Sequence, residues 1–312
     1  MANYVYYLLI GLATVLFSFQ FVFQKMYQRE RGESFVSTCY FGCFTCLLFG
    51  CFMWALNGFS LRITLFSVLM ALCSALISLA CRYSGLVAMS VADLAKYSLY
   101  LMLGGMVVPF LYGMIFNGDD FTWQKLCCFL LVGAAVFVSK LGGKTGGKVE
   151  HAWKARICYI VLFLTNGLIG VVSTIHQQSG LDAVPSRDFT ILSMVMNVAL
   201  SSVLLLVLAI LAKARKKGGV DATPRGGARV LTKKGLLTTM FAVVGYGLAN
   251  GIGNYLLLIS LTQVEPSVQY SMVTGGCILM TVVTGLIFRE KITRYKVISA
   301  VLIIGGTLLL LI

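Results

Sequence analysis

The chain has 312 residues, of which 59% are hydrophobic and only 12% are charged, whereas soluble domains carry about 25% charged residues. The apolar residues gather in runs of the length that a membrane-spanning helix needs, about 20 residues, so an ordinary soluble fold is excluded. The net charge of +14 does not indicate nucleic-acid binding, because the basic residues crowd into short segments between apolar runs, as in cytoplasmic loops of membrane proteins.

Ten helices are predicted in chain order, so the expected fold is an all-α, polytopic membrane protein. The expected helices cover residues 4–27, 35–56, 63–82, 90–116, 122–139, 156–177, 188–212, 235–261, 267–288 and 294–312. Glycine, asparagine and charged residues fill the segments between them, as is usual where helices end.

Two connecting segments, residues 140–156 and 213–234, are strongly basic and rich in glycine. Because Lys and Arg concentrate in cytoplasmic loops, these segments are expected on the cytoplasmic side. An even number of spans then places both termini outside. We therefore expect a multi-pass protein of the cell membrane.

The chain contains an internal repeat, in which residues 104–125 align with residues 275–296 without a gap. The register pairs Gly104-Gly105 with Gly275-Gly276, Asp119 with Glu290, Thr122 with Thr293, and Lys125 with Lys296. The repeat divides the chain into two five-helix halves, residues 1–148 and 149–312. Because five is odd, the second half enters the membrane from the opposite side. Inverted repeats are typical of secondary transporters, whose binding sites lie between the halves near the membrane midplane.

Polar side chains inside the predicted helices are candidates for a substrate site, because such groups are costly in a bilayer. The candidates are Gln20, Gln24, Asp93, Lys96, Tyr97, Asn166, His176, Asn250, Asn254 and Tyr270. Amide groups can bind uncharged polar solutes. They can equally form hydrogen bonds between helices, and tyrosines often serve in packing.

Two sets of candidates carry specific alternatives. Asp93 and Lys96 lie three residues apart on one helix face, where they form either a structural ion pair or a contact with a charged substrate or a proton. His176 can relay protons near neutral pH, or it can simply reach the interface at its helix end.

Paired glycines recur inside the predicted helices at Gly104, Gly105, Gly275 and Gly276. Glycine is unfavourable within a helix, but small residues let membrane helices pack closely or bend. Their equivalent places in two inverted halves suit paired gates, and close packing alone is the alternative.

The five-plus-five plan resembles the drug/metabolite transporter superfamily, in its EamA-like branch. The residues that carry the resemblance are 270–276 with 288–293, 103–109 with 119–122, Asn166-Gly167 with His176-Gln177, and 247–254. The resemblance implies a secondary carrier of small molecules, such as amino acids, sugars, nucleotides or drugs, without catalytic residues. Thr122 in the first half and Thr293 in the second are expected to cap the helices that follow them.

The sequence thus predicts a secondary active transporter that moves a small polar metabolite or drug by alternating access. No cofactor, metal or catalytic residue is expected, and the expected partners are the substrate and the lipid bilayer, with proton or ion coupling left open. The alternative is an intramembrane enzyme or a receptor without transport activity. Against an enzyme, the chain has only two histidines and shows neither a metal-ligand cluster nor a nucleophile elbow.

Overall fold

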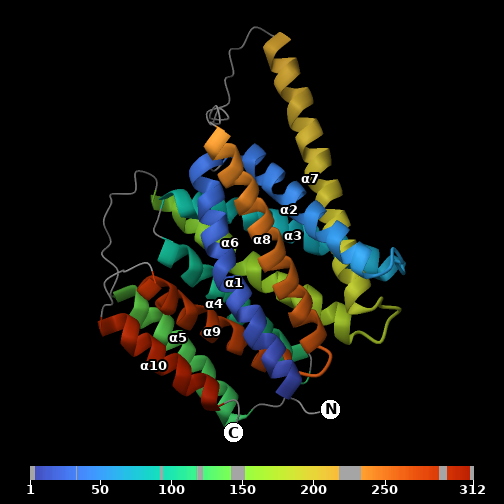
Figure 1. Cartoon of the computed structure of the whole chain (residues 1–312). Coiled ribbons are helices and arrows are strands. Elements are labelled where there is room, and N and C mark those ends of the chain that lie inside the picture. Colours follow the sequence, from blue (N-terminus) through green and yellow to red (C-terminus); the bar gives the residue numbers. More distant parts are fainter. Residues whose placement is uncertain are drawn as a thin grey trace.

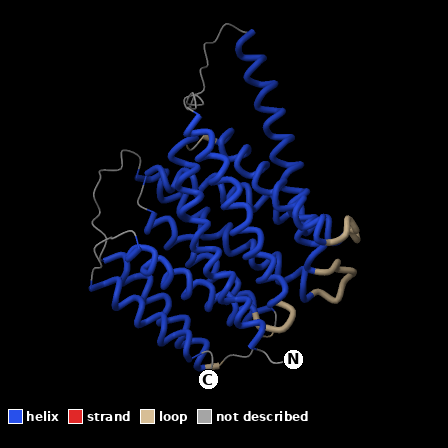
Figure 2. The backbone as a smooth tube through the Cα atoms, viewed as in Figure 1, coloured by secondary structure: helices blue, strands red, loops and turns tan. Residues whose placement is uncertain are grey.

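The computed structural model describes residues 4–32, 34–91, 94–116, 118, 122–141, 152–217, 233–287 and 294–309, which form ten helices (Figure 1). The helices are α1 (Tyr4–Arg31), α2 (Phe35–Leu56), α3 (Leu65–Val91), α4 (Leu94–Phe116), α5 (Trp123–Leu141), α6 (Ala152–Gln178), α7 (Ser186–Lys217), α8 (Lys233–Ser260), α9 (Pro266–Ile287) and α10 (Arg294–Leu309). Figure 2 shows no strand in this part of the chain, which confirms the all-α class.

The helices have the length and surface of membrane spans. Six of them, α1, α2, α3, α6, α7 and α8, are long and apolar enough to cross a bilayer, and α4, α5 and α10 contain shorter apolar stretches. Large apolar side chains face outward, with Leu8 73%, Leu206 62% and Phe241 59% exposed. An apolar outer surface of this kind fits lipid and not water. The protein is therefore a multi-pass membrane protein.

Local sequence sets the ends of several helices. Ser34 caps α2 by accepting a hydrogen bond from the Ser37 amide at 3.1 Å. Thr122 accepts a bond from the Lys125 amide at 3.4 Å and so caps α5, as expected. Gly32, with φ of +78°, follows the end of α1 in the left-handed conformation that glycine adopts most easily.

The helices pack in pairs that are related by a shift of five in helix number. The contact between α1 and α8 corresponds to the contact between α6 and α3. The contact between α4 and α6 corresponds to the contact between α9 and α1. The α3–α7 contact corresponds to α8–α2 in the same way. The contacts α2–α7, α4–α9 and α5–α10 each map onto themselves. The packing therefore has the exchange symmetry of a two-fold repeat.

The end predicted for the third helix is wrong. The prediction ended this helix at residue 82. In the structure α3 continues to Val91. A Cβ at Gly85 would lie 2.9 Å from the Tyr97 ring of α4, so glycine here permits close packing of α3 on α4 and does not end the helix.

Candidate functional site

A cavity of about 210 Å³ lies among eight of the ten helices. Helices α5 and α10 contribute none of its described lining and pack together at one side of the bundle (Figure 1). Seven of the ten candidate residues line the cavity: Gln20, Gln24, Tyr97, Asn166, Asn250, Asn254 and Tyr270. The two halves of the chain therefore share one cavity, in which these polar side chains stand among apolar ones.

The amides of α1 and α8 meet across this cavity. Asn250 donates from Nδ2 to Gln20 Oε1, and Asn254 Nδ2 donates to the Asn250 carbonyl at 2.8 Å. On α1, Gln24 accepts a 3.0 Å hydrogen bond from the Tyr97 hydroxyl of α4. Each amide thus binds another helix or its own backbone through one atom, and its second polar atom is available in principle to a solute.

The second half contributes two more candidates through bonds to backbone carbonyls. Asn166 Nδ2 donates to the Leu101 carbonyl at 2.7 Å, and the Tyr270 hydroxyl donates to the Gly170 carbonyl at 3.3 Å. These bonds satisfy carbonyl groups and fix both side chains beside the cavity. The expected helix–helix role and a cavity position therefore occur together in the same residues.

Arg82 is a charged residue of the lining that the sequence analysis missed. It comes from α3 and reaches α2 and α7, where its NH1 group donates to Cys46 Sγ at 3.3 Å and its NH2 group donates to Asn197 Oδ1. Gly42 makes room for the guanidinium, since a Cβ there would lie 3.2 Å from Arg82 Cζ. Arg82 is therefore built into the contact between α2, α3 and α7.

His176 lies behind the cavity wall and is not part of the described lining. Its ring stacks on Phe189, with the ring centroids 3.6 Å apart, and Phe189 itself lines the cavity. The Nε2 atom forms a 2.9 Å hydrogen bond with Ser67 Oγ at the start of α3. The histidine is completely buried because these groups enclose it, so neither a substrate contact nor an interfacial position is seen.

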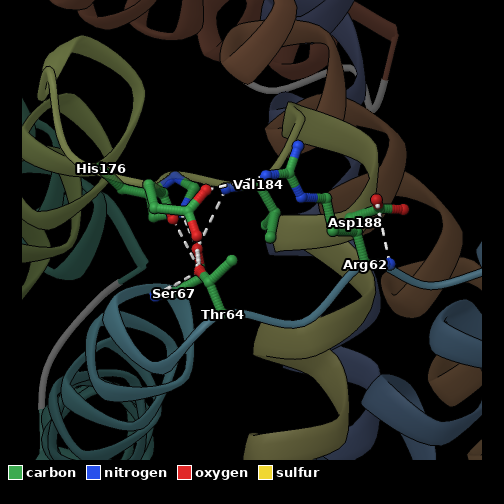
Figure 3. A network of polar contacts seen from close by, with 7 residues as sticks. Arg62, Thr64, Ser67, His176, Val184 and Asp188 are labelled. Atoms are coloured by element: carbon green, nitrogen blue, oxygen red, sulfur yellow. Dashed lines mark hydrogen bonds and ion pairs between the residues drawn. The ribbon is translucent and has the colours of Figure 1, made fainter.

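The His176 bond belongs to a network that joins the two halves at one end of the molecule (Figure 3). Ser67 Oγ also accepts from the Val184 amide at 3.1 Å. Close by, the buried Asp188 accepts from Asn57 Nδ2 at 2.7 Å and from the Arg62 amide at 3.3 Å. In Figure 2 the loops at 57–64, 179–185 and 261–265 all lie toward this end.

Two ion pairs at the same end also connect the halves. Arg62 NH2 lies 2.8 Å from Asp182 Oδ1, and both side chains are well exposed. Lys125 Nζ, at the start of α5, pairs with Glu265 Oε2, just before α9 begins. The exposed Arg62–Asp182 pair contributes little to stability. Lys125 is buried, so its pair with Glu265 and the buried bonds of Asp188 and His176 carry most of the connection.

Two candidates fall where the structure gives no account of them. Asp93 lies outside the described residues, as does the side chain of Lys96, whose backbone belongs to α4. The pairing of these two residues stays a prediction.

Three of the four paired glycines lie at close approaches between elements, and all four lie inside helices, as expected. A Cβ on Gly104 would lie 2.0 Å from the backbone oxygen of Phe163, and one on Gly105 would lie 2.6 Å from Asn166 Nδ2. A Cβ on Gly276 would lie 2.5 Å from Thr14 Cγ2, and Gly275 is buried. Close packing therefore accounts for Gly104, Gly105 and Gly276, and movement at the paired glycines stays a prediction.

Comparison with known proteins decides the family. The sequence profile of the EamA-like transporter family matches residues 157–312, which is half of the chain. This chain belongs to the EamA-like transporter family. The match covers most of the second half, from α6 onward, and confirms the family resemblance of the sequence.

A solved crystal structure is similar to this EamA-like transporter in fold. It superposes with a TM-score of 0.68 at 17% sequence identity, covering 96% of this chain and 94% of the other. At this identity the likeness concerns the fold alone. No curated protein gives a significant match, so these comparisons indicate a transporter without indicating its solute.

Six of the polar lining residues of this EamA-like transporter that sequence reasoning missed lie in two regular stripes. On α3 the stripe is Ser74, Ser78 and Arg82, and on α7 it is Thr190, Ser193 and Asn197. Residues four apart, or three and four apart, share a helix face. This spacing was visible in the sequence and could have identified both stripes, although serine and threonine are too common in membrane helices to stand out singly.

Proposed function

We propose that this EamA-like transporter is a secondary active carrier that moves a small polar solute across the cell membrane by alternating access. The observation that carries the proposal is the cavity of about 210 Å³ that both halves of the chain line with polar side chains. Pockets for drug-sized ligands have volumes of about 300–1,000 Å³. A metabolite therefore suits the cavity better than a drug.

The two halves, residues 1–148 and 149–312, act in this proposal as inverted five-helix repeats. The exchange symmetry of the helix pairs supports this division, because every principal contact has a counterpart when helix numbers are shifted by five. In transporters of this kind, one half rocks against the other around a site at their interface. The halves meet mainly along α1–α8, α4–α6, α3–α6, α5–α10, α2–α7, α3–α7 and α4–α9, so these contacts rearrange when the halves move.

The network around His176 and Asp188 closes the cavity at one end in this proposal. Phe189 forms part of the cavity wall, and the stacked His176 holds it through Ser67 of the first half. Opening this end requires the Ser67–His176 and Asn57–Asp188 bonds to break. Each hydrogen bond is worth only about 0.5–3 kcal/mol, so a solute that binds the open state more tightly can offset their loss.

Uptake into proteoliposomes tests the proposal. Vesicles with the purified protein, and protein-free vesicles as a control, are incubated with a mixture of small polar metabolites under an imposed proton or sodium gradient. Mass spectrometry of the washed vesicles should find at least one solute enriched only where the protein and a gradient are both present. A matched variant with Gln20→Leu and Asn250→Leu, which replaces the polar pair by apolar side chains, should lose this enrichment.

The same measurement distinguishes the alternatives. A solute converted into a new product would indicate an intramembrane enzyme. Binding without enrichment under any gradient would indicate a receptor, and either result would contradict the proposed transport.

A further inference from the structure

We infer that the solute of this carrier bears an oxyanion group, a carboxylate or a phosphate, which the guanidinium of Arg82 binds. The inference rests on the proposed transport function and adds the chemical class of the solute to it. It depends on the charge balance of the cavity, on the partners of Arg82, and on the groups beside it.

Arg82 carries the only formal charge at neutral pH among the described residues of the cavity lining. The other lining groups are amides, hydroxyls, thiols, glycines and apolar side chains. An arginine is charged at every physiological pH. The described wall of the cavity is thus neutral apart from one fixed positive charge.

The protein partners of Arg82 do not neutralise this charge. Both acceptors, Cys46 Sγ and Asn197 Oδ1, are uncharged. Arg82 Nε is buried without a hydrogen-bond partner in the described part of the chain, where the ion pairs involve Arg62 and Lys125 instead. A buried charge without a counter-charge costs several kcal/mol. An anion that enters the cavity supplies this counter-charge and is attracted to Arg82.

The surroundings of Arg82 hold it in place for such an anion. Asn197 donates from Nδ2 to the Ser193 carbonyl at 2.8 Å, which orients its Oδ1 atom toward the guanidinium. Ser78 precedes Arg82 by one helical turn and also lines the cavity, so its hydroxyl can supply a further donor. A guanidinium with neighbouring hydroxyl donors is a recurrent arrangement for carboxylate and phosphate recognition.

Other solute classes fit this wall less well. A cation would meet a like charge in a site of low dielectric constant. A neutral solute could bind the amides of Gln20 and Asn250, but it would leave the Arg82 charge without compensation. The observed lining therefore favours a solute with one negative group near α3 and a polar remainder near α1 and α8.

Selective uptake from a natural mixture tests the inference, because the protein itself selects the solute. Proteoliposomes with wild-type protein, Arg82→Gln, Arg82→Lys or the control Arg156→Gln are incubated with a soluble metabolite extract. Arg156 is exposed at the beginning of α6 and lies outside the described cavity lining. Parallel samples use an extract treated with phosphatase, and vesicles are assayed with imposed gradients and with preloaded extract for exchange. Size-exclusion chromatography checks that each variant is folded.

Support requires that the enriched solutes carry a carboxylate or a phosphate. Arg82→Gln should then lower their uptake by about tenfold or more, the factor expected when a charge-assisted hydrogen bond is lost. Arg82→Lys keeps the charge without the planar fork and should retain part of the uptake even if Arg82→Gln fails to fold, and Arg156→Gln should match wild type. Loss of the signal after phosphatase treatment identifies a phosphate, and its persistence identifies a carboxylate.

Enrichment of neutral or cationic solutes would overturn the inference while leaving transport intact. Undiminished uptake of oxyanions by Arg82→Gln would overturn the role of Arg82 in the same way. Absence of any enriched solute would contradict the proposed transport function itself, and the inference with it.

Discussion

The closest approach of α4 and α6 gives a sharp test of whether the paired glycines act in packing. We expect Gly104→Ala to destabilise the protein, because the new Cβ would lie 2.0 Å from the Phe163 carbonyl oxygen and 2.7 Å from its Cα atom. Both are backbone atoms that cannot rotate away. The reverse contact is also tight, since a Cβ on Gly167 would lie 2.5 Å from the Gly104 oxygen.

The size of the effect follows from these distances. Non-bonded heavy atoms reach their best contact at about 3.5–4.0 Å, so the two helices must separate by more than 1 Å to admit one methyl group, as the 2.0 Å approach requires. Overpacking of this kind costs about 1–3 kcal/mol. For a chain of this size we expect the melting temperature to fall by about 2–6 °C.

Thermal unfolding of the purified protein in detergent, followed by intrinsic fluorescence, measures the change. Gly133→Ala is the matched control, because Gly133 lies within α5 and a Cβ there meets nothing within 4 Å. It should leave the melting temperature unchanged or raise it slightly, since alanine favours helix over glycine. Equal melting temperatures for the two variants would refute the packing argument. Lost transport in Gly104→Ala at full stability would indicate a moving contact instead.

Three further predictions concern the cycle, the cytoplasmic side and the intramembrane charges. Asp188→Ala removes a buried hydrogen-bond acceptor worth about 1.5–3 kcal/mol and should favour opening of the end that carries the His176 and Asp188 network. An impermeant thiol reagent applied from that side should then label native Cys46 in the cavity about tenfold faster or more. An unchanged labelling rate would show that this network does not close the cavity. A cysteine at Lys148 should be protected from the same reagent outside intact cells, and labelling there would reverse the predicted orientation. Asp93→Asn combined with Lys96→Met should abolish uptake at an unchanged melting temperature, whereas retained uptake would exclude this pair from the site.

Periodicity and composition were enough to predict the helices. Runs of apolar residues fix each span because a bilayer leaves few other solutions for the backbone. The exception was the end of α3, which continues to Val91 beyond the predicted end at residue 82. Local sequence could not reveal that Gly42 on α2 leaves space for Arg82, or that Gly85 packs on Tyr97, since both facts depend on tertiary contacts.

The candidate site was predictable where polar residues are rare and large. Amides and tyrosines within membrane helices are conspicuous, and seven of the predicted candidates line the cavity. His176 was equally conspicuous, yet it lies behind Phe189. The neighbours that enclose it, Ser67 and Phe189, lie in the first turns of α3 and α7, and their approach follows from the packing of the whole bundle.

Binding and movement are linked in this cavity because its polar contacts join the two halves. Arg82 belongs to the first half and its acceptor Asn197 to the second, and Gln20 and Asn250 bridge the halves in the same manner. A solute that competes for these groups replaces bonds between the halves by bonds to itself. Because a ligand shifts an equilibrium only through its differential affinity for the two states, such a replacement is a direct route by which an oxyanion bound at Arg82 can change the balance between them.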